Sequence, residues 1–551
     1  MSDFTIGVDF GTQSVRAIVV RCSDGTTISE STFTYPHGVL DRSLPDGTPL
    51  PGPDWALADP NDYMTGLIHV VHNAVAKSGL APEQIGAIAI AATACTLLPV
   101  NKDLVPLCCL DEYRSRPQAW CKLWKHHRAQ PYATQLTETA LLMKQDFLAN
   151  YGGKISSEWA VPKVMEVFDQ DREVYNASDR FMQFSDWLTG WMVGNPDVQN
   201  GSIAAYKALW SATDGYPCDK YLAAVAPQVP EIVHDKIRGT MYLAGDCVGT
   251  LTKEAAHKLG LSTSSRVGMA HTDAHASAYG SGIADEGDYV FILGTSSCGH
   301  LITRRQEKVS GVTGALPDGL LRGYTCYSAG QACVGDMLEW FIKNSVPSAV
   351  KEAAASSGLS LHAYLEREAS KQQPGECGLV TLDWFNGNRS TLVNAALSGI
   401  TVGLTMETTP IDIYRSMLEA IAFGHREIVD NFTSSNLSIK RIVICGGIAH
   451  KNNLLLQIMS DVLGRPLEVS AEPQATALGA AICAATALGA DNGGYESLPE
   501  AIHQMKAGCL KTIQPNLENT KAYERIYNHY HQLYNIFGRQ YSGIMEDLRV
   551  K

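Results

Sequence analysis

The strongest constraint on the fold is a pattern that occurs twice, once near residue 10 and once near residue 295. In both places an apolar run predicts a buried strand, a turn containing Gly-Thr follows, and a second extended segment leads back. Because the copies are half a chain apart, they indicate two domains of one ancestral fold rather than a solenoid, whose repeats are far shorter. The predicted strands are residues 4–9, 14–20 and 26–34 in the first copy and residues 289–293 and 298–303 in the second.

The length of 551 residues also favours at least two domains. A glycine-rich and acidic stretch at residues 280–287 supplies the boundary, so the predicted domains are 1–283 and 284–551. Strands alternate with helical periodicity after the initial meander, which predicts an α/β fold with mixed sheets. The clearest of these later elements are helices over residues 62–76, 411–432 and 453–463 and a strand over residues 441–445.

The composition argues against several classes of protein. Lys and Arg number 44 against 57 Asp and Glu, a net charge of −13, whereas a nucleic-acid surface needs a basic face. No apolar run reaches the roughly 18 residues of a membrane span, and charges interrupt the N-terminal apolar stretch, unlike a signal peptide. The 14 cysteines are scattered without a CxxC pair, which is typical of reduced thiols. A polyphosphate ligand would therefore be bound locally, by backbone amides, a few cations and a metal.

Both Gly-Thr turns have residues suited to binding phosphate. Glycine lets backbone amides approach phosphoryl oxygens closely, and the neighbouring hydroxyl groups can donate as well. Asp9 stands at the end of its strand, where a carboxylate can hold Mg²⁺ through water. A single Gly-Thr turn is most often only a hairpin, but two with the same flanking strands are more specific. The predicted phosphate-binding residues are Asp9, Gly11, Thr12, Gln13, Gly294, Thr295 and Ser296.

A third glycine feature lies between the strand at residues 441–445 and the helix at residues 453–463. Gly446 and Gly447 leave bare backbone at a strand-to-helix turn, where an adenine ring or ribose can lie close to a helix N-terminus. A tight strand-to-helix connection explains the same glycines equally well. We predict that Gly446, Gly447 and Asn452, at the end of this turn, bind the adenosine.

Some runs of the sequence, such as residues 154–159, have no residue pattern that a general chemical function would require. A match to such a run is therefore specific to one protein family. With these runs the chain resembles the FGGY carbohydrate kinases over nearly its whole length, and within that family it is most similar to the bacterial ribulokinase branch. The matching runs are residues 8–16, 35–39, 123–127, 151–159, 272–275, 294–296, 382–389 and 446–449.

The resemblance implies a fold, a reaction and its cofactors. The fold is two ribonuclease-H-like domains of the actin-like ATPase type, with mixed sheets flanked by helices and a cleft between them. The cofactors are ATP and Mg²⁺. The reaction is transfer of the γ-phosphate to the terminal hydroxyl of a ketopentose, L-ribulose first, which implies L-arabinose catabolism in the cytoplasm. Enzymes of this type often self-associate, so a homodimer is expected, although no segment identifies an interface.

Asp273 is the candidate catalytic base. It follows the apolar run 267–270 in a setting of small residues that leaves room for a substrate, although a lone Asp there is more often a helix N-cap. The resemblance implies the role of base, and Asp9 and Asp273 together are the predicted Mg²⁺ carboxylates. His271 and His275 flank Asp273 at the spacing of a zinc pair, but the HExxH glutamate is missing, and His275 is interpreted as structural.

Lys207 stands between apolar neighbours. Such a lysine is ordinarily a surface residue whose stem lies along apolar groups. The resemblance implies instead that it lies in the sugar pocket, where its ammonium can donate to a ketose oxygen. The complete set of predicted sugar-binding residues is Ala94, Lys207, Asp273, Ser328 and Gln331.

Two departures from the ribulokinase pattern leave the sugar open. Those enzymes carry an acidic residue where this chain has Ala91, and a Glu in the segment that here contains Ser328. Losing a carboxylate that organises sugar hydroxyls keeps the reaction type but changes the specificity. The alternatives are a kinase for another ketose or polyol, such as D-ribulose or xylulose, and a non-catalytic sugar or nucleotide sensor. The intact Asp9, Thr12 and Asp273 argue against the sensor.

Overall fold

The computed structural model describes residues 3–548, which form two compact units. Unit 1 takes in the described chain up to Ala284, together with Leu316–Cys326 and Gln474–Ala507. Unit 2 takes in Asp285–Ala315, Tyr327–Pro473 and the described chain from Gly508. Two segments from the second half of the sequence thus belong to unit 1. The division of the sequence at 283/284 into two family domains stays a prediction.

Unit 1 is built on a six-stranded mixed sheet in the order β11-β12-β5-β1-β2-β3. Strand β1 pairs antiparallel with β2 and parallel with β5, and β5 pairs parallel with β12. The first three strands confirm the predicted meander. The strands are β1 (Phe4–Phe10), β2 (Ser14–Arg21), β3 (Thr27–Thr34), β5 (Ile85–Ala92), β11 (Cys247–Thr250) and β12 (Arg266–Thr272).

Two long helices cover opposite faces of this sheet. Ile6, Val8 and Phe10 of β1 pack with α1 in one buried cluster. Because side chains alternate along a strand, Thr5 points to the other face, where its hydroxyl donates to the carbonyl of Ala481 in α16. Asp9 has the same parity as Thr5 and therefore lies on the α16 face. The helices at the sheet are α1 (Pro60–Ser78), α5 (Phe184–Val193), α6 (Gly201–Lys207), α9 (Lys253–Leu259), α10 (Asp273–Gly280), α16 (Ala475–Leu488) and α17 (Leu498–Met505).

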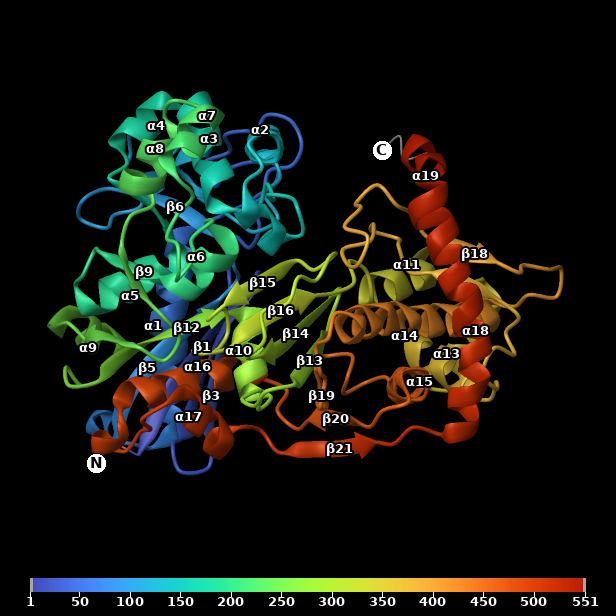
Figure 1. Ribbon diagram of the computed structural model, residues 1–551. Helices are drawn as coiled ribbons and strands as arrows, with labels where there is room; N and C mark the ends of the chain where they lie inside the picture. Colours follow the sequence, from blue (N-terminus) through green and yellow to red (C-terminus); the bar gives the residue numbers. More distant parts are fainter. Residues whose placement is uncertain (1–2, 549–551) are drawn as a thin grey trace. The chain divides into compact units, whose positions relative to one another are not determined.

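A helical insertion extends one end of unit 1, where α2, α3, α4, α7 and α8 gather (Figure 1). A four-stranded antiparallel sheet, β4-β7-β6-β8, and the parallel pair β9-β10 also belong to this unit. The helices are α2 (Gln130–Leu142), α3 (Ala160–Gln170), α4 (Arg172–Ala177), α7 (Asp219–Val225) and α8 (Val229–Glu231), and the strands are β4 (Leu57–Ala58), β6 (Leu97–Val100), β7 (Cys121–Lys122), β8 (Arg180–Gln183), β9 (Val198–Asn200) and β10 (Thr240–Tyr242).

Unit 2 is built on a seven-stranded sheet in the order β15-β16-β14-β13-β19-β20-β21. Strand β13 pairs antiparallel with β14 and parallel with β19, which repeats the pairing of β1 with β2 and β5. The hairpin β17-β18 is separate from this sheet. The strands are β13 (Asp288–Leu293), β14 (Ser297–Thr303), β15 (Gly314–Pro317), β16 (Thr325–Ala329), β17 (Val380–Leu382), β18 (Ile400–Val402), β19 (Arg441–Cys445), β20 (Leu467–Ser470) and β21 (Cys509–Ile513).

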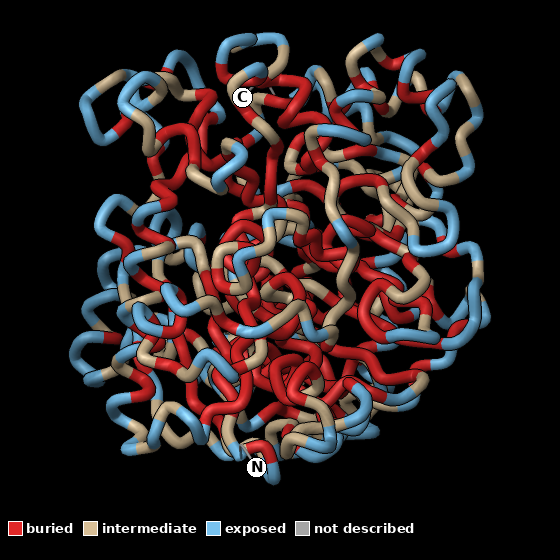
Figure 2. Tube along the Cα trace, turned by 90° about the vertical axis from the view of Figure 1, so that its left-hand side faces the viewer, coloured by how far each residue is buried: buried red, intermediate tan, exposed pale blue. Residues whose placement is uncertain are grey.

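Helix α14 passes through the core of unit 2. It starts with Thr409 and Asp412 capping one another and with Pro410 at its first position, a strong helix start. Its apolar face packs in one cluster with β13, β19, α15 and α18. Figure 2 shows the buried residues gathered in the interior of the trace and many of the exposed residues on its outer turns. The helices are α11 (Gly335–Ser345), α12 (Ser348–Ser356), α13 (Leu361–Ala369), α14 (Pro410–Ser434), α15 (Asn453–Leu463), α18 (Leu517–Asn535) and α19 (Ser542–Leu548).

The predicted elements agree with these bounds. Strand β19 and helix α15 have the predicted limits, and α14 extends the predicted helix by only a few residues. Mixed sheets with flanking helices confirm the α/β prediction. Among the helices in residues 3–548, none combines the length and the apolar character needed to cross a membrane.

Candidate functional site

The turn between β1 and β2 is held in place by hydrogen bonds on three of its residues. The amide of Gly11 donates to the carbonyl of Ser14 at 2.9 Å, and the carbonyl of Gln13 accepts from the amide of Tyr35 at 3.0 Å. The hydroxyl of Thr12 accepts from Nε1 of Trp124 at 3.2 Å. The amide of Gly11 is thus used within the turn, so phosphate would have to be bound by the other groups of the turn.

Asp9 lies at the end of β1 as a buried carboxylate. Burial raises its pKa, the negative charge of Asp273 raises it further, and the nearby Arg16 guanidinium, 3.3 Å from Oδ2, lowers it in part, so that the pKa is about 7. Asp9 and Asp273 are therefore close enough to repel one another. Two carboxylates that repel each other fit a divalent cation, because its charge would relieve both the burial and the repulsion.

Asp273 is the first residue of α10, directly after β12 ends at Thr272. Thr272 takes the N-cap position, so Asp273 is not the cap. One of its carboxylate oxygens, Oδ1, accepts from the amide of Ala274 at 2.7 Å. Burial raises the pKa of Asp273, while that hydrogen bond and the positive charge of Lys207 lower it. The ammonium of Lys207 is thus close enough to favour the ionised form of Asp273, which is the form that accepts a proton.

Lys207, the last residue of α6, and the loop that contains Ala94 belong to the same region of unit 1. The charges of Lys207 and Asp273 both act on Cys95, whose thiol has a pKa raised by burial to about 11. Ala94, next to it, is half-buried. The structure therefore brings three of the predicted sugar-binding residues, Ala94, Lys207 and Asp273, into one neighbourhood.

The buried Lys163 of α3, which the sequence pattern did not single out, supports this neighbourhood. Its ammonium donates to the carbonyl of Cys95 at 2.6 Å and to the carbonyl of Leu123 at 2.7 Å. Burial lowers the pKa of Lys163 to about 8. The lysine thus ties the loop around Ala94 to the segment before Trp124. A lysine among apolar residues of a helix was a weak signal, because most such lysines reach the surface.

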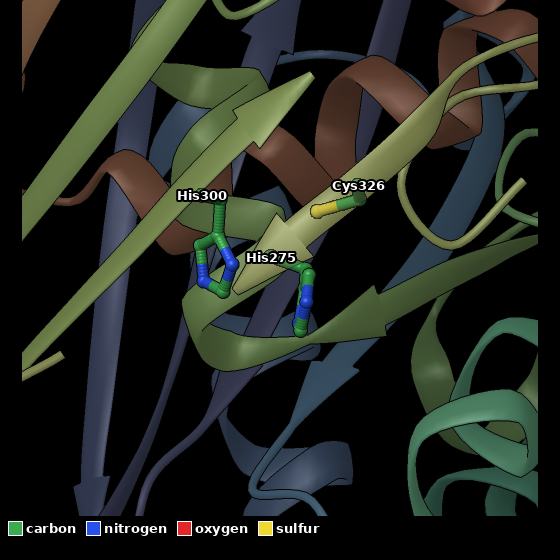
Figure 3. A group of neighbouring side chains, drawn as sticks. All are labelled: His275, His300 and Cys326. Carbon is green, nitrogen blue, oxygen red and sulfur yellow. The ribbon is translucent and has the colours of Figure 1, made fainter. Parts of the chain in front are cut away.

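The two histidines beside Asp273 have contacts within unit 1. His271 accepts from the amide of Thr272 at 2.7 Å, and its Nε2 lies 2.8 Å from the carbonyl oxygen of Gly319, so both of its ring nitrogens are bonded to backbone. Burial lowers its pKa to about 4. Nδ1 of His275 lies 2.7 Å from the hydroxyl of Thr272, and a nitrogen of His275 lies within 4.8 Å of the Cys326 sulfur (Figure 3). The hydrogen bonds of the two rings fit the structural interpretation of this pair.

In the turn between β13 and β14 of unit 2 the glycine amide also donates within the turn, but to the residue two positions on instead of three. The amide of Gly294 donates to the carbonyl of Ser296 at 3.0 Å. The carbonyl of Thr295 accepts from the amides of Val334 at 2.9 Å and Asp336 at 3.2 Å, next to the start of α11. The side chain of Thr295 is exposed and free to meet a ligand from solvent.

The diglycine lies directly after β19, and its two residues differ. Gly446 has a φ of 97°, and a Cβ there would lie 2.4 Å from the carbonyl oxygen of Leu293, so a side chain is excluded. A Cβ at Gly447 would meet nothing within 4 Å. The structure therefore requires glycine at the first position but leaves open space at the second. Asn452 caps α15 by accepting from the amide of Leu455 at 2.8 Å.

The last two predicted sugar-binding residues are buried in unit 2. Oγ of Ser328 lies 2.9 Å from Nδ1 of His300. The side-chain nitrogen Nε2 of Gln331 donates to the carboxylate of Asp383 at 2.7 Å and to the backbone carbonyl of Ile421 at 3.1 Å. These bonds give Gln331 a structural role in its unit. Contact of either residue with a sugar stays a prediction.

Comparison with known proteins finds similarity along most of the chain. Residues 4–280 match the N-terminal domain, and residues 289–488 the C-terminal domain, of the FGGY family of carbohydrate kinases. The ribulokinase of Anoxybacillus flavithermus is 41% identical over 546 residues, which cover 99% of this chain and 96% of that protein. The ribulokinase of Mycolicibacterium smegmatis is 42% identical over 551 residues, with 99% and 96% covered.

Solved structures share the fold at low sequence identity. A gluconate kinase from Lactobacillus acidophilus has a TM-score of 0.80 at 16% identity, covering 98% of this chain and 99% of its own. A xylulose kinase from the same organism, solved with a bound ligand, has a TM-score of 0.79 at 16% identity, with 98% and 99% covered. At this identity the likeness extends to the fold alone.

Proposed function

Because the chain belongs to the FGGY family of carbohydrate kinases, we propose that it transfers the γ-phosphate of ATP to the terminal hydroxyl of L-ribulose, giving L-ribulose 5-phosphate. The observation that carries the choice of sugar is the identity of about 40% with ribulokinases over nearly the whole chain. The reaction would serve L-arabinose catabolism in the cytoplasm. The expected homodimer stays a prediction that sedimentation velocity can test.

Asp273 is the proposed base. Phosphoryl transfer needs the attacking hydroxyl to be oriented and its proton accepted. Burial of Asp273 makes it a better proton acceptor than an exposed carboxylate, and Lys207 keeps enough of it ionised for the task. Lys207 would donate to the oxygen of the ketose, and the backbone around Ala94 would line the sugar.

The nucleotide half of the reaction would use neutral groups and one cation. The turns at Gly11-Thr12 and Gly294-Thr295 would each donate to phosphate oxygens, and Gly447 would leave room for the adenosine. Asp9 and Asp273 would hold Mg²⁺, which when bound neutralises charge on the phosphates. The raised pKa of Asp9 supports this proposal, because burial and the charge of Asp273 raise it more than Arg16 lowers it, and a bound cation would offset both.

A second candidate is a kinase for another ketose or polyol, and the two departures from the ribulokinase pattern favour it. Ala91 lies beside Asp9 in the register of β5 and β1, where an acidic residue would add to the negative charge. Ser328 is neutral and already bonded to His300. Fewer carboxylates leave fewer acceptors for sugar hydroxyls, so a different set of sugars would fit.

ADP release measured with a panel of L-ribulose, D-ribulose, xylulose, pentoses and polyols separates these candidates. The proposal predicts the highest kcat/KM for L-ribulose, with phosphorus NMR showing a phosphomonoester on its terminal carbon. A higher kcat/KM for another ketose or polyol would replace L-ribulose as substrate. ATP binding without a response to any sugar would contradict the kinase and favour a sensor.

A further inference from the structure

Asn200 is a buried amide that joins two elements of unit 1. It ends β9 and is the N-cap of α6, where its Oδ1 accepts from the amide of Ile203 at 3.0 Å. The other end of the same side chain, Nδ2, donates to the carbonyl of Ala270 in β12 at 2.7 Å. The residue is 2% exposed, so both bonds are shielded from water.

The two bonded elements carry the two charged residues of the proposed sugar site. Helix α6 ends at Lys207, two turns after its cap. Strand β12 continues from Ala270 to Thr272, and Asp273 follows directly. Asn200 therefore fixes the start of the helix that presents the ammonium against the strand that presents the carboxylate. A shift of about 1 Å between such groups can lower a rate about a hundredfold.

Asn200 is itself held in position. Its backbone amide donates to Oδ2 of Asp186 at 3.2 Å, and Asp186 is buried at the start of α5. The hydroxyl of Ser185 donates to the other oxygen of that carboxylate at 3.4 Å. The path from α5 through Asn200 to β12 is thus a continuous set of hydrogen bonds within one unit.

We propose that Asn200 is a positioning residue for phosphoryl transfer, because it locks the helix of Lys207 to the strand that leads to Asp273. This inference rests on the proposed roles of Lys207 and Asp273. The task needs an acceptor and a donor on one short side chain, and a carboxamide supplies both. Serine keeps the capping oxygen but cannot reach the carbonyl of Ala270, and aspartate keeps the capping oxygen but lacks the amide donor.

The test starts with Asn200→Ser and its matched control Asn516→Ser. Asn516 caps α18 in unit 2, where its Oδ1 accepts from the amides of Glu518 and Asn519. We expect Asn200→Ser to lower kcat/KM for the sugar about 10- to 100-fold while KM for ATP stays within about twofold. Asn516→Ser is expected to keep both constants within about twofold. Thermal unfolding is measured on both, and Asn200→Asp replaces Asn200→Ser if the serine variant does not fold.

A double-mutant cycle with Lys207→Met separates positioning from a loss of stability. If Asn200 acts through Lys207, Asn200→Ser should lower kcat/KM less in the Lys207→Met background than in the wild type. Equal factors in the two backgrounds would overturn the inference. So would near-normal sugar turnover of Asn200→Ser when Lys207→Met is impaired. Near-normal turnover of both Lys207→Met and Asp273→Asn would instead contradict the proposed function.

Discussion

The two sheets of the molecule share their topology and differ in their charges. In unit 1 the order β2-β1-β5-β12-β11 has its pairs antiparallel, parallel, parallel and antiparallel, and the order β14-β13-β19-β20-β21 in unit 2 has the same sequence of directions. Two residues before the turn glycine, however, unit 1 has Asp9 and unit 2 has Ile292. Directly after β12, unit 1 has Asp273, and directly after the corresponding strand β20, unit 2 has Ala471.

Under the proposed function, this difference would divide the tasks of the site between the two sheets. The sheet of unit 1 ends in carboxylates, which can accept a proton and hold a cation. At the corresponding ends unit 2 offers apolar residues, hydroxyls and the Gly446-Gly447 backbone, which suit a nucleotide that brings its own negative charge. The duplication explains why the two turns look alike, whereas the substitutions at the strand ends give the two sheets different charges.

Removing the carboxylate of Asp273 should have the largest effect on turnover. We expect Asp273→Asn to lower kcat about a thousandfold, because a general base typically contributes about 10²- to 10⁴-fold. The measurement is steady-state ADP release at saturating sugar and ATP. Asp288→Asn is the control. Asp288 begins β13 in unit 2, at the end of that strand away from the Gly294-Thr295 turn, and its carboxylate accepts a hydrogen bond from Arg441. Loss of activity in the control alone would contradict the assignment.

Asp9→Asn should increase stability while impairing turnover. The pKa of Asp9 is raised from 3.8 to about 7, so its ionisation costs folding free energy that grows as the pH rises from about 4 to about 7. We therefore expect the variant to gain on the order of 1–4 kcal/mol in the free energy of unfolding at pH 8, and nothing below pH 3. Urea denaturation at several pH values checks this. A gain that does not depend on pH would refute the electrostatic explanation.

Gly446→Ala should destabilise unit 2. The φ of 97° and the 2.4 Å approach of a Cβ to the carbonyl oxygen of Leu293 both oppose a side chain. A strained residue of this kind costs about 1–3 kcal/mol. Urea denaturation of the variant beside the wild type measures the loss. Unchanged stability would mean that the turn relaxes without cost.

Among these variants, Gly447→Ala should have the smallest effect on stability, and its effect on turnover should be confined to the KM for ATP. A Cβ at Gly447 meets nothing within 4 Å, so stability should stay within about 0.5 kcal/mol of the wild type. If the nucleotide lies on this backbone, KM for ATP should rise several-fold while KM for the sugar is unchanged. An unchanged KM for ATP would remove Gly447 from the proposed adenosine site.

Local signals predicted the strands and the turns, because each depends on a few neighbouring residues, whereas the role of Asp273 came from the resemblance to the family and stays a prediction. Strand β19 and helix α15 have clear patterns of apolar residues, and Gly446 follows the strand as Gly464 follows the helix. Their bounds could therefore be predicted from the sequence. The assignment of α16 to the sheet of unit 1 was not readable, because it rests on contacts with β1 more than 450 residues away, such as Thr5 with Ala481.

The residues that support the site also could not be predicted from the sequence. Lys163 and Asn200 bind backbone carbonyls of distant segments, and a carbonyl leaves no mark on the residue type that presents it. An Asn just before a run of small residues does indicate a helix N-cap. It does not indicate that the other end of the amide holds Ala270. For a related reason, Ala91 and Ser328 mark in the sequence where acidic groups are absent without identifying the groups that act in their place.

In this account the carboxylates of unit 1 carry the chemistry, the Gly-Thr turns of both units bind the phosphates, and the neutral Gly446-Gly447 backbone of unit 2 binds the adenosine. Isothermal titration of ATP into Asp273→Asn and Gly447→Ala, without Mg²⁺ and without sugar, tests it most directly, because the proposed metal role of Asp273 then does not contribute. We predict a Kd for ATP within about twofold of the wild type for Asp273→Asn, despite its lost turnover, and a Kd raised several-fold for Gly447→Ala. The reverse pattern, with ATP binding lost in Asp273→Asn and kept in Gly447→Ala, would contradict the account.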